Sequence, residues 1–305
     1  MKWSIDDALV FVAVADTGGV TSAAIRLGTS KSTVSKVLTR LESALGVRLL
    51  KRNSRNVRIT EEGQTFYHHA RRIMEQVDEA DATMSGITAS PQGRLVAALP
   101  VAFAREFVAP ALPQFHARYP DIELELVLAN HTVDLIREEI DVSVVVGALT
   151  DSELISVPIH QGQLIWITTP AYAEKYGIGP DSTDALPHVQ ICEKRYGGRQ
   201  IQVKVGDRNT TLNFRENLIH VNDPLIVREY VLTGGGVSFL PEQYCHRLLQ
   251  RGELVRVFQG VRFQDTAAVL SAIYPGRRLM PRKTAAFLDF LRGLDLSAGS
   301  PGPVT

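Results

Sequence analysis

The sequence predicts an α/β protein with a separate helical part at its N-terminus. Residues 1 to about 60 contain three short segments whose apolar residues recur at helical spacing, followed by a basic turn. One longer helical pattern follows, up to about residue 90. Beyond it, strand-like and helix-like runs alternate, which is typical of βαβ units and a parallel sheet with helices on its faces. A chain of 305 residues is long enough for two or three such domains.

The distribution of charge is more informative than its total. The formal net charge is zero, and 22% of the residues are charged, as in many soluble proteins. From Ser22 to Thr60, however, nine lysines and arginines stand against the single acid Glu42. This segment predicts a compact basic surface inside a neutral protein, which is typical of a nucleic-acid partner.

Targeting and metal-binding signals are not found in the sequence. The N-terminus does not follow the charged, apolar, small-residue order of a signal peptide, and no apolar run is as long as a membrane helix. We therefore expect a cytoplasmic protein. Cys192 and Cys245 are too few for a disulfide framework and are not spaced as metal ligands, so we interpret both as plain thiols.

Capping residues mark the first two helices. Ser4 can cap a helix that ends at Gly18, and its apolar positions follow helical spacing: Ile5, Ala8, Leu9, Val12 and Ala15. A second short helix opens near Thr21 or Ser22 and stops at Gly28.

The third helix is predicted to be amphipathic. Ser30 is a natural N-cap, and the helix ends at Gly46. Apolar residues spaced four, three and four apart make one buried stripe: Val34, Leu38, Leu41 and Leu45. Polar side chains must then project outward: Lys31, Ser32, Ser35, Lys36, Thr39 and Arg40.

A cation-rich hairpin is predicted directly after this helix. In RLLKRNSRNVRIT, two strand-like runs flank a polar turn at residues 53–56, which would hold three arginines beside the third helix. A short helix, a tight turn and a longer polar-faced helix form a helix-turn-helix, whose second helix enters the major groove of DNA. We expect bases and phosphates to be contacted by Thr21, Ser22, Lys31, Ser32, Thr33, Ser35, Lys36, Thr39, Arg40, Arg52, Arg55 and Arg58.

Two other interpretations of the third helix were weighed. Ser32 and Lys36 lie four residues apart, as in a catalytic Ser–Lys dyad, but nothing in the sequence supplies an oxyanion hole. An ordinary solvated face is the other alternative. The sequence has no metal cluster, nucleophile elbow or cofactor loop, and the glycines at 234–236 precede a strand, the reverse of a dinucleotide fingerprint. We expect neither an enzyme nor a cofactor or metal.

The long helix predicted from Thr60 carries a heptad pattern. Its apolar residues are spaced alternately four and three apart: Phe66, Ala70, Ile73, Val77, Ala80, Met84 and Ile87. We expect dimerisation through Phe66, Ile73, Val77, Ala80 and Met84. The alternative is an amphipathic helix that lies on its own domain. TASPQG, residues 88–93, reads as a linker.

The remainder predicts alternating strands and helices. They are strand RLVAALP, helix AREFVAPALPQFHARY, strand IELELVLA, helix TVDLIREE and strand DVSVVVG, then several strand candidates, a helix from Pro224, and a closing strand and helix from Ala267 to Leu291.

The segment from Phe11 to Gly63 resembles the N-terminal winged helix-turn-helix of LysR-type transcriptional regulators. It agrees in its apolar frame and at Ala23, Ala24, Ser35, Leu41, Glu42, Leu45, Gly46, Arg52, Arg55, Thr60 and Gly63. Later motifs resemble the effector domain of the same family: GRLVAALP, FHARYP, VDLIREEIDVSVVVG, TPAYAEKYG, VNDP and GGGVSFLPEQY.

The resemblance implies three parts. Residues 1–60 would form the winged helix-turn-helix, 61–90 a dimerising linker helix, and 91–305 an effector-binding domain. That domain would contain two Rossmann-like α/β subdomains, about 91–161 with 267–293 and about 162–266, as in periplasmic binding proteins. The implied function is sequence-specific transcriptional regulation by a homotetramer, with promoter DNA, a small-molecule effector and RNA polymerase as partners. A protein that only captures a solute is the rival, against which the basic helix-turn-helix counts.

This chain departs from the family pattern at two places. Lys31-Ser32 replaces the common Gln-Pro at the start of the recognition helix, so the base preference is not carried over. The sequence Pro100-Val101-Ala102-Phe103 lacks the hydroxyl with which many relatives hold an anionic effector. An apolar or aromatic effector is therefore favoured over a carboxylate, and a member without a strong effector is the alternative.

Ligands in open α/β folds bind beyond the carboxyl ends of strands. On that rule, we expect the effector to be bound by Val101, Ala102, Phe103, Asn130, His131, Gly147, Ala148, Thr168, Asp223, Gly234 and Gly235.

Overall fold

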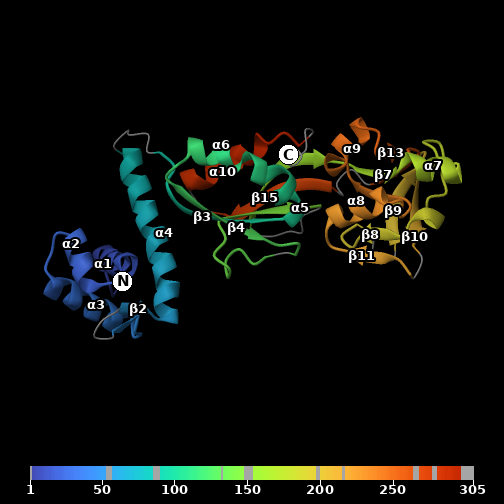
Figure 1. Ribbon diagram of the computed structural model, residues 1–305. Coiled ribbons are helices and arrows are strands. Elements are labelled where there is room, and N and C mark those ends of the chain that lie inside the picture. Colours follow the sequence, from blue (N-terminus) through green and yellow to red (C-terminus); the bar gives the residue numbers. More distant parts are fainter. Residues whose placement is uncertain are drawn as a thin grey trace. The chain divides into compact units, whose positions relative to one another are not determined.

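The computed structural model divides the chain into two compact units, Met1–Ala89 and Ser90–Thr305 (Figure 1). It describes the chain except residues 1, 53–56, 85–89, 132, 148–153, 197–199, 215–216, 264–267, 277–279 and 297–305. Of residues 52, 75, 76 and 78–84, only the backbone is described. Each unit is considered by itself.

The first unit contains four helices and a small hairpin within its described residues. They are α1 (Ile5–Thr17), α2 (Val20–Arg26), α3 (Lys31–Leu45), β1 (Leu50–Arg52), β2 (Val57–Ile59) and α4 (Glu61–Met84). The Ser4 side chain accepts from the amide of Asp7 in a reciprocal capping box, and Ser30 accepts from the amide of Thr33. Gly18 and Gly46 end α1 and α3 in the left-handed conformation. The helices predicted from capping residues are thus confirmed.

The core of the first unit lies where the predicted apolar stripe of α3 meets α1. Val34, Leu38 and Leu41 are fully buried and pack with Phe11 of α1, among other residues of this core. Leu45, the last residue of the stripe, is half-buried at the edge of the same cluster. Burial of this stripe turns the opposite face of α3 toward solvent.

The first turns of α4 belong to this core. Phe66 contacts the rings of Trp3 and Phe11, with both centroid distances 5.4 Å, and Ala70 is fully buried. Phe66 therefore packs in its own domain, as in the alternative interpretation of the heptad pattern. Ile73 and Val77, one and two turns further on, are half-buried.

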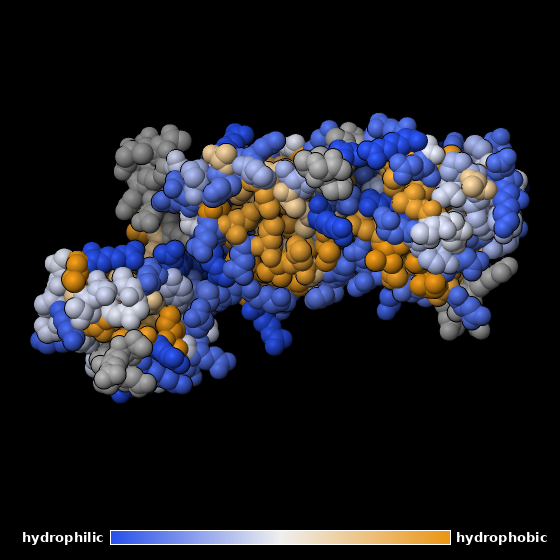
Figure 2. Space-filling model, in the orientation of Figure 1, coloured by the Kyte–Doolittle hydropathy of each residue, from blue (hydrophilic) through white to orange (hydrophobic). Residues whose placement is uncertain are grey.

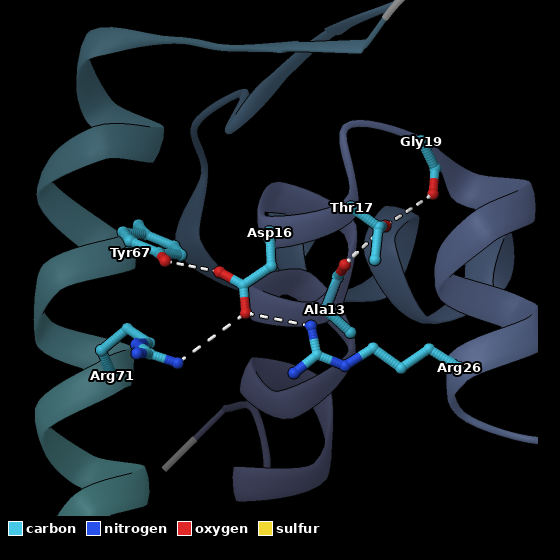
Figure 3. A network of polar contacts seen from close by, with 7 residues as sticks. All are labelled: Ala13, Asp16, Thr17, Gly19, Arg26, Tyr67 and Arg71. Carbon is cyan, nitrogen blue, oxygen red and sulfur yellow. Dashed lines mark hydrogen bonds and ion pairs between the residues drawn. The ribbon is translucent and has the colours of Figure 1, made fainter. Parts of the chain in front are cut away.

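A polar cluster around Asp16 joins three helices of the first unit (Figure 3). The Asp16 carboxylate at the end of α1 accepts from Tyr67 of α4 at 2.5 Å and from Arg26 of α2 at 3.3 Å. Arg71, one turn beyond Tyr67, lies 3.7 Å from the same carboxylate. The Thr17 hydroxyl donates to the carbonyls of Ala13 and Gly19, which closes the end of α1. This cluster fixes α4 against the helix pair α1–α2.

The first subdomain of the second unit is built on one mixed sheet in the order β4-β3-β5-β15-β6. Its strands are β3 (Gly93–Leu99), β4 (Ile122–Leu128), β5 (Val142–Val146), β6 (Leu154–Gly162) and β15 (Ala268–Pro275). β3 pairs in parallel with β4 and β5, whereas β15 runs antiparallel to β5 and β6. The predicted parallel direction is thus correct for four strands of this sheet and wrong for β15, because β15 brings the chain back from the second subdomain in the opposite direction.

Helices α6 (Ala109–Arg118) and α10 (Arg282–Arg292) lie side by side on this sheet (Figure 1). Phe115 of α6 and Phe290 of α10 are in ring contact at 4.9 Å. The single helix predicted over residues 104–119 is instead a π-helical turn at Ala104–Val108 followed by α6, and a short helix α5 (Val101–Phe103) precedes both. Prolines 110 and 113 lack an N–H donor, which removes two of the hydrogen bonds of a regular helix here.

The helix predicted over TVDLIREE is wrong in its described part, which forms turns. The Asp134 carboxylate accepts from the amides of Ile136 and Arg137, as in a helix cap. The turn stops at Glu139, whose φ of 55° is left-handed. One capped turn is therefore made, and the backbone then leaves the helical path.

Within its described residues, the second subdomain contains three small sheets. β7 (Leu164–Thr168) lies between β12 (Ser238–Pro241) and β13 (Val255–Arg256), β8 (Ile191–Glu193) pairs in parallel with β11 (Ile219–Val221), and β9 (Gln200–Val205) lies between β10 (Arg208–Asn213) and β14 (Val261–Phe263). Its helices are α7 (Pro170–Tyr176), α8 (Pro224–Leu232), α9 (His246–Gln250) and 3-10 turns at Leu186–His188 and Glu242–Tyr244.

Two strands carry the chain between the subdomains and pair where they cross. Gly162 ends β6 opposite Ala268, the first residue of β15. A Cβ atom at Gly162 would lie 2.4 Å from the carbonyl oxygen of Ala268. Glycine is therefore required for the close approach of the two backbones.

Among the described residues, no single helix is both long and apolar enough to span a membrane; by length and composition alone, the α1–α2 pair, bent by 117°, passes as a broken span.

Candidate nucleic-acid interface and ligand cleft

The polar face of α3 is open to solvent. Of the side chains predicted to contact DNA on this helix, Ser35 is half-buried. The other six are exposed: Lys31, Ser32, Thr33, Lys36, Thr39 and Arg40. Thr21 and Ser22 are exposed on α2. The structure therefore brings the predicted residues of α2 and α3 to the surface of one small domain.

Hydroxyl groups order the first turn of α3. The Ser30 hydroxyl lies 2.8 Å from those of both Ser32 and Thr33, and the Thr39 hydroxyl donates to the Ser35 carbonyl at 3.0 Å. These local bonds fix the rotamers of small polar side chains before any ligand arrives. The helix start thus presents a preorganised set of donors and acceptors next to two lysines.

Arg40 differs from the other cations of this face because its guanidinium is held by the buried Asp7 of α1. Burial would raise the pKa of Asp7, but hydrogen bonds from Arg40 and Ser4 lower it below its ordinary value. The pair fixes α3 to α1, so Arg40 is a positioning residue at the edge of the exposed face.

The hairpin is tied to α3 by a buried carboxylate. Glu42 of α3 is 5% exposed, and its Oε1 accepts from the amides of Leu49 at 2.9 Å and Leu50 at 3.1 Å. Its Oε2 lies 3.3 Å from the guanidinium of Arg48. The only acid of the basic segment is therefore a structural bridge that sets the hairpin beside the recognition helix.

A second anchor fixes the other end of the hairpin. The Thr60 hydroxyl donates to the Arg48 carbonyl at 2.7 Å and accepts from the Gly63 amide at 2.9 Å. A Cβ atom at Gly63 would lie 2.0 Å from the Leu49 carbonyl oxygen. Only glycine allows α4 to start this close to the hairpin.

The hairpin itself is antiparallel, with Lys51 opposite Arg58. Arg58 is exposed beside it. The side chain of Arg52 and the whole of Arg55 lie outside the described residues. Two cations, Lys51 and Arg58, are thus placed on a hairpin whose first strand is tied to α3 through Glu42.

A cleft in the second unit lies between its two subdomains. The first subdomain contributes the carboxyl ends of β3 and β5 and part of β15, and the second contributes the ends of β8, β11 and β12. The lining residues are Pro100, Ala102, Asn130, Val146, Glu193, Arg195, Tyr196, Asn222, Pro224, Pro241, Gln243, Tyr244 and Leu270. The enclosed space is about 20 Å³, which holds about one water molecule.

Glu193 is the buried charge of this cleft, 3% exposed at the end of β8. Burial raises the pKa of its carboxyl to about 7, although Arg195, 3.3 Å from Oε1, opposes the shift. The second oxygen, Oε2, has no hydrogen-bond partner among the described residues. Gln243, 6% exposed after β12, has an equally unpartnered Oε1.

Two polar contacts join the subdomains at the cleft, in addition to the ring contact of Phe107 with Tyr244 at 5.5 Å. Arg195 donates to the Val146 carbonyl at 3.3 Å. Arg228 of α8 donates to both carboxylate oxygens of Glu106, at 3.2 and 3.4 Å, and to the Tyr244 carbonyl at 3.0 Å. Burial would lower the pKa of Arg228, but its bonds to Glu106 raise it, so this pair stays charged.

Several of the residues predicted to bind an effector lie at this cleft. Ala102 and Asn130 line it, and the amide of Val101 donates to the Asn130 side chain at 3.1 Å. Gly147 directly follows the lining residue Val146. Asp223 lies between two lining residues, and its carboxylate caps α8 by accepting from the Leu225 amide.

Other predicted effector residues are placed elsewhere. Phe103 is fully buried in the core of the first subdomain, and Thr168 is fully buried with its hydroxyl bound to the Gly236 carbonyl. Gly234 and Gly235 form the turn after α8. His131 is exposed, and Ala148 lies outside the described residues.

The sequence reasoning missed the charged and aromatic half of the cleft: Glu193, Arg195, Tyr196, Gln243 and Tyr244. The same strand-end rule would have found Glu193, because β8 is a buried parallel strand that ends there. Its three-residue length hid it among several strand candidates.

The cysteines and histidines carry no sign of a reactive centre in the described part of the chain. Burial raises the pKa of the Cys192 and Cys245 thiols to about 12, which makes both unreactive. No three His, Cys, Asp or Glu side chains of the described residues are grouped to hold a metal ion.

On the face shown in Figure 2, hydrophobic side chains of the second unit gather in two areas, one over each subdomain, with hydrophilic residues between them. The large hydrophobic residues of this unit that are exposed are Leu128, Ile136, Ile155, Tyr176, Ile219 and Ile226. Exposed apolar areas of this kind are typical of interaction surfaces.

Comparison with known proteins covers both units. Residues 5–64 match the family described as bacterial regulatory helix-turn-helix protein, lysR family, and residues 88–295 match LysR substrate binding domain. An HTH-type transcriptional regulator from Xanthomonas campestris pv. campestris is 32% identical over 95% of this chain and 85% of its own. The regulator PtxR from Pseudomonas aeruginosa is 31% identical over 92% and 90%.

Solved structures agree with the whole fold. CrgA, a LysR-type transcriptional regulator from Neisseria meningitidis, is 27% identical with a TM-score of 0.58, covering 94% of this chain and 97% of that one. AphB, a virulence activator from Vibrio cholerae, is 25% identical with a TM-score of 0.57, covering 95% and 99%. The predicted fold class, an N-terminal helix-turn-helix followed by a two-subdomain α/β domain, is confirmed by these likenesses.

Proposed function

The chain belongs to the LysR family of transcriptional regulators, and we propose that α3 and the β1–β2 hairpin bind its promoter DNA while a small molecule in the inter-subdomain cleft modulates that binding. The observation that carries the proposal is the exposed polar face of α3, ordered at its first turn by Ser30 and flanked by a cationic hairpin. This is the arrangement in which a recognition helix reads base edges while neighbouring cations hold phosphates.

The groups are divided by role. Lys31 and Ser35 are proposed to contact base edges near the start of the helix, where the groove is entered. The hairpin cations contact phosphates and carry no sequence information. The proposed DNA contacts are Thr21, Ser22, Lys31, Ser32, Thr33, Ser35, Lys36, Thr39, Arg40, Arg52, Arg55 and Arg58. Of these, Arg40 is also held by Asp7.

The regulator is proposed to act as a homotetramer in the cytoplasm, without catalytic activity of its own, and with RNA polymerase as a further partner. Two half-buried residues of α4, Ile73 and Val77, support dimerisation through the second part of this helix. A dimer presents its heads with two-fold symmetry, so the operator should contain two half-sites about one helical turn or a multiple of it apart.

The proposal is tested by fluorescence anisotropy with a labelled duplex from the DNA upstream of this protein's own gene, and a scrambled duplex as control. Titrations are repeated across a salt series, because phosphate contacts make affinity salt-dependent. A complex roughly a thousandfold tighter than the control supports sequence-specific regulation. If both duplexes bind alike, a selection from genomic fragments follows, and failure to enrich any site refutes the proposal.

A further inference from the structure

The cleft between the subdomains contains two buried hydrogen-bond acceptors that the protein does not satisfy. Glu193 reaches it from the end of β8, and Gln243 reaches it from the turn after β12. Their side-chain oxygens Oε2 and Oε1 are buried and have no partner among the described residues. A buried acceptor without a donor costs about 1–3 kcal/mol, and more when it is charged. Two of them in one cleft indicate that donors are supplied by a ligand.

Two donors at which an anion could be held in this cleft already have partners. The amide of Val101, at the start of α5, donates to Asn130 Oδ1, and Pro100 before it has no N–H. Arg195 donates to Glu193 Oε1 and to the Val146 carbonyl. No serine or threonine is found at positions 100–103. An incoming carboxylate would therefore compete with these internal bonds and would meet the carboxyl group of Glu193.

The walls of the cleft suit a cation with an apolar body. Two tyrosines, Tyr196 and Tyr244, line it beside the acceptors, and a cation is attracted by the face of an aromatic ring. Most other lining residues are apolar: Pro100, Ala102, Val146, Pro224, Pro241 and Leu270.

We propose that the effector carries a protonated amine, whose ammonium group donates to Glu193 and Gln243 while its apolar part lies against the tyrosines and prolines of the cleft. The inference rests on the proposed function, in which this cleft receives the effector. An ammonium group has several N–H donors and no acceptor, so one group satisfies both unpartnered oxygens and neutralises the buried charge.

Charges around Glu193 agree with this choice. Burial raises the pKa of Glu193, and the negative charge of Asp223 at the start of α8 raises it further. The positive charge of Arg195 opposes both effects. Of the other titratable groups on the packed elements, Cys192, Tyr196 and Tyr244 are neutral at pH 7, because burial raises the pKa of each. Arg228 of α8 is paired with Glu106, and His220 of β11 lies 3.5 Å from the Cys192 sulfur. Ammonium binding would favour the ionised carboxyl, so a proton is released when the ligand binds near pH 7.

Entry requires the cleft to open, because the space of about 20 Å³ holds only about one water molecule. The contact from Arg195 to the Val146 carbonyl crosses the cleft and must break or lengthen. The two connecting strands approach each other closely at Gly162, and the subdomains would move about this point.

The test is isothermal titration of the full-length protein with three probes that share one ring: benzylamine, benzyl alcohol and benzoate. At pH 8, Glu193 is mostly ionised and benzylamine is still protonated. We expect benzylamine to bind roughly tenfold or more tightly than the alcohol, since a hydrogen bond to a charged group contributes more than a neutral one. Titration at pH 7 in buffers of different ionisation enthalpy should show the released proton.

Glu193→Gln removes the charge at nearly constant shape and should abolish the preference for the amine. Glu174→Gln, on the exposed surface of α7, removes one carboxylate away from the cleft and should leave it unchanged. Gln243→Leu removes the second acceptor and should weaken benzylamine more than benzyl alcohol. Melting curves of all three variants report whether they fold.

The inference is overturned if benzylamine binds no more tightly than benzyl alcohol or benzoate, or if Glu193→Gln keeps the preference. The promoter-binding assay stays separate from this result. If the protein prefers the amine but its affinity for DNA does not change, the inference is supported and effector control is refuted. If the protein without any probe does not bind DNA specifically, only the proposed function is refuted.

Discussion

The bridge made by Glu42 gives the sharpest prediction for the first unit. Its carboxylate accepts from two buried amides, those of Leu49 and Leu50, and thereby connects the recognition helix with the hairpin. Glu42→Ala leaves both N–H groups without an acceptor in a place that water does not reach. Glu42→Gln keeps an acceptor oxygen and loses the charge, so it is the matched control.

The size of the effect follows from these contacts. Each stranded amide costs about 1–3 kcal/mol, so Glu42→Ala should lower the free energy of unfolding of the first unit by about 3 kcal/mol or more. Arg48 adds little, because its side chain is 79% exposed and its ion pair is screened by solvent. Glu42→Gln should cost about 1 kcal/mol, the difference between a charged and a neutral hydrogen bond.

Hydrogen exchange followed by mass spectrometry measures this within the full chain. Peptides from α1 and α3 exchange through opening of the first-unit core, and about 3 kcal/mol corresponds to roughly a hundredfold faster exchange. Peptides from β15 belong to the second unit and serve as an internal reference. Equal exchange in the alanine and glutamine variants would refute the assigned role of the carboxylate.

Four further predictions follow from the structure. Lys31→Ala should lower affinity for the specific site more than for random DNA, as measured by anisotropy. Arg58→Ala should weaken binding to both DNAs and reduce the slope of log affinity against log salt by roughly one. Equal losses on both duplexes would contradict the division of roles. Gly63→Ala puts a methyl group 2.0 Å from a backbone oxygen, so the first unit should lose its cooperative melting transition; a wild-type melting curve speaks against the close packing. Val77→Asp should shift sedimentation to the monomer, and an unchanged profile removes the dimer proposed through α4. Because the pKa of Glu193 is raised in the folded state, from 4.5 to about 7, its contribution to stability is greatest below pH 4.5 and falls by about 3 kcal/mol up to pH 7. Glu193→Gln should remove this part of the pH dependence of the melting temperature, and a variant that keeps it contradicts the assignment.

The helices of the first unit could be predicted because their signals are local. Ser4, Ser30, Gly18 and Gly46 lie where a cap is needed, and the spacing of apolar residues sets the buried face of α3. The ion pair between Asp7 and Arg40 could not be predicted, because the two residues are 33 positions apart and the sequence predicts each charge to be exposed to solvent. Arg40 was therefore assigned to DNA with the other exposed cations.

Fewer of the residues that line the cleft were predicted, because the sequence does not show how deeply a side chain is buried. The strand-end rule selects an edge of the sheet, and it gave Ala102 and Asn130, which line the cleft. It does not tell which residue at that edge turns toward the core, so Phe103 and Thr168 were included although both are fully buried. Sequence also does not show that a glutamate is buried, and burial is what makes Glu193 chemically distinctive.

Two polar contacts that join the subdomains, beside the ring contact of Phe107 with Tyr244, bear on how a small ligand could control the protein. The Arg228–Glu106 pair is partly exposed, with 16% and 18% of the two side chains accessible, and the contact of Arg195 with Val146 is a single long hydrogen bond. The Arg195 bond is exposed to water and contributes little, whereas the Arg228–Glu106 pair is mostly buried and costs more to break. The balance between a closed and an open form of the cleft depends on these contacts. A ligand that binds one form roughly a hundredfold more tightly then suffices to reverse a tenfold preference between the forms. Since coupling is reciprocal, promoter DNA that favours the same form must tighten ligand binding by the factor by which ligand tightens DNA binding.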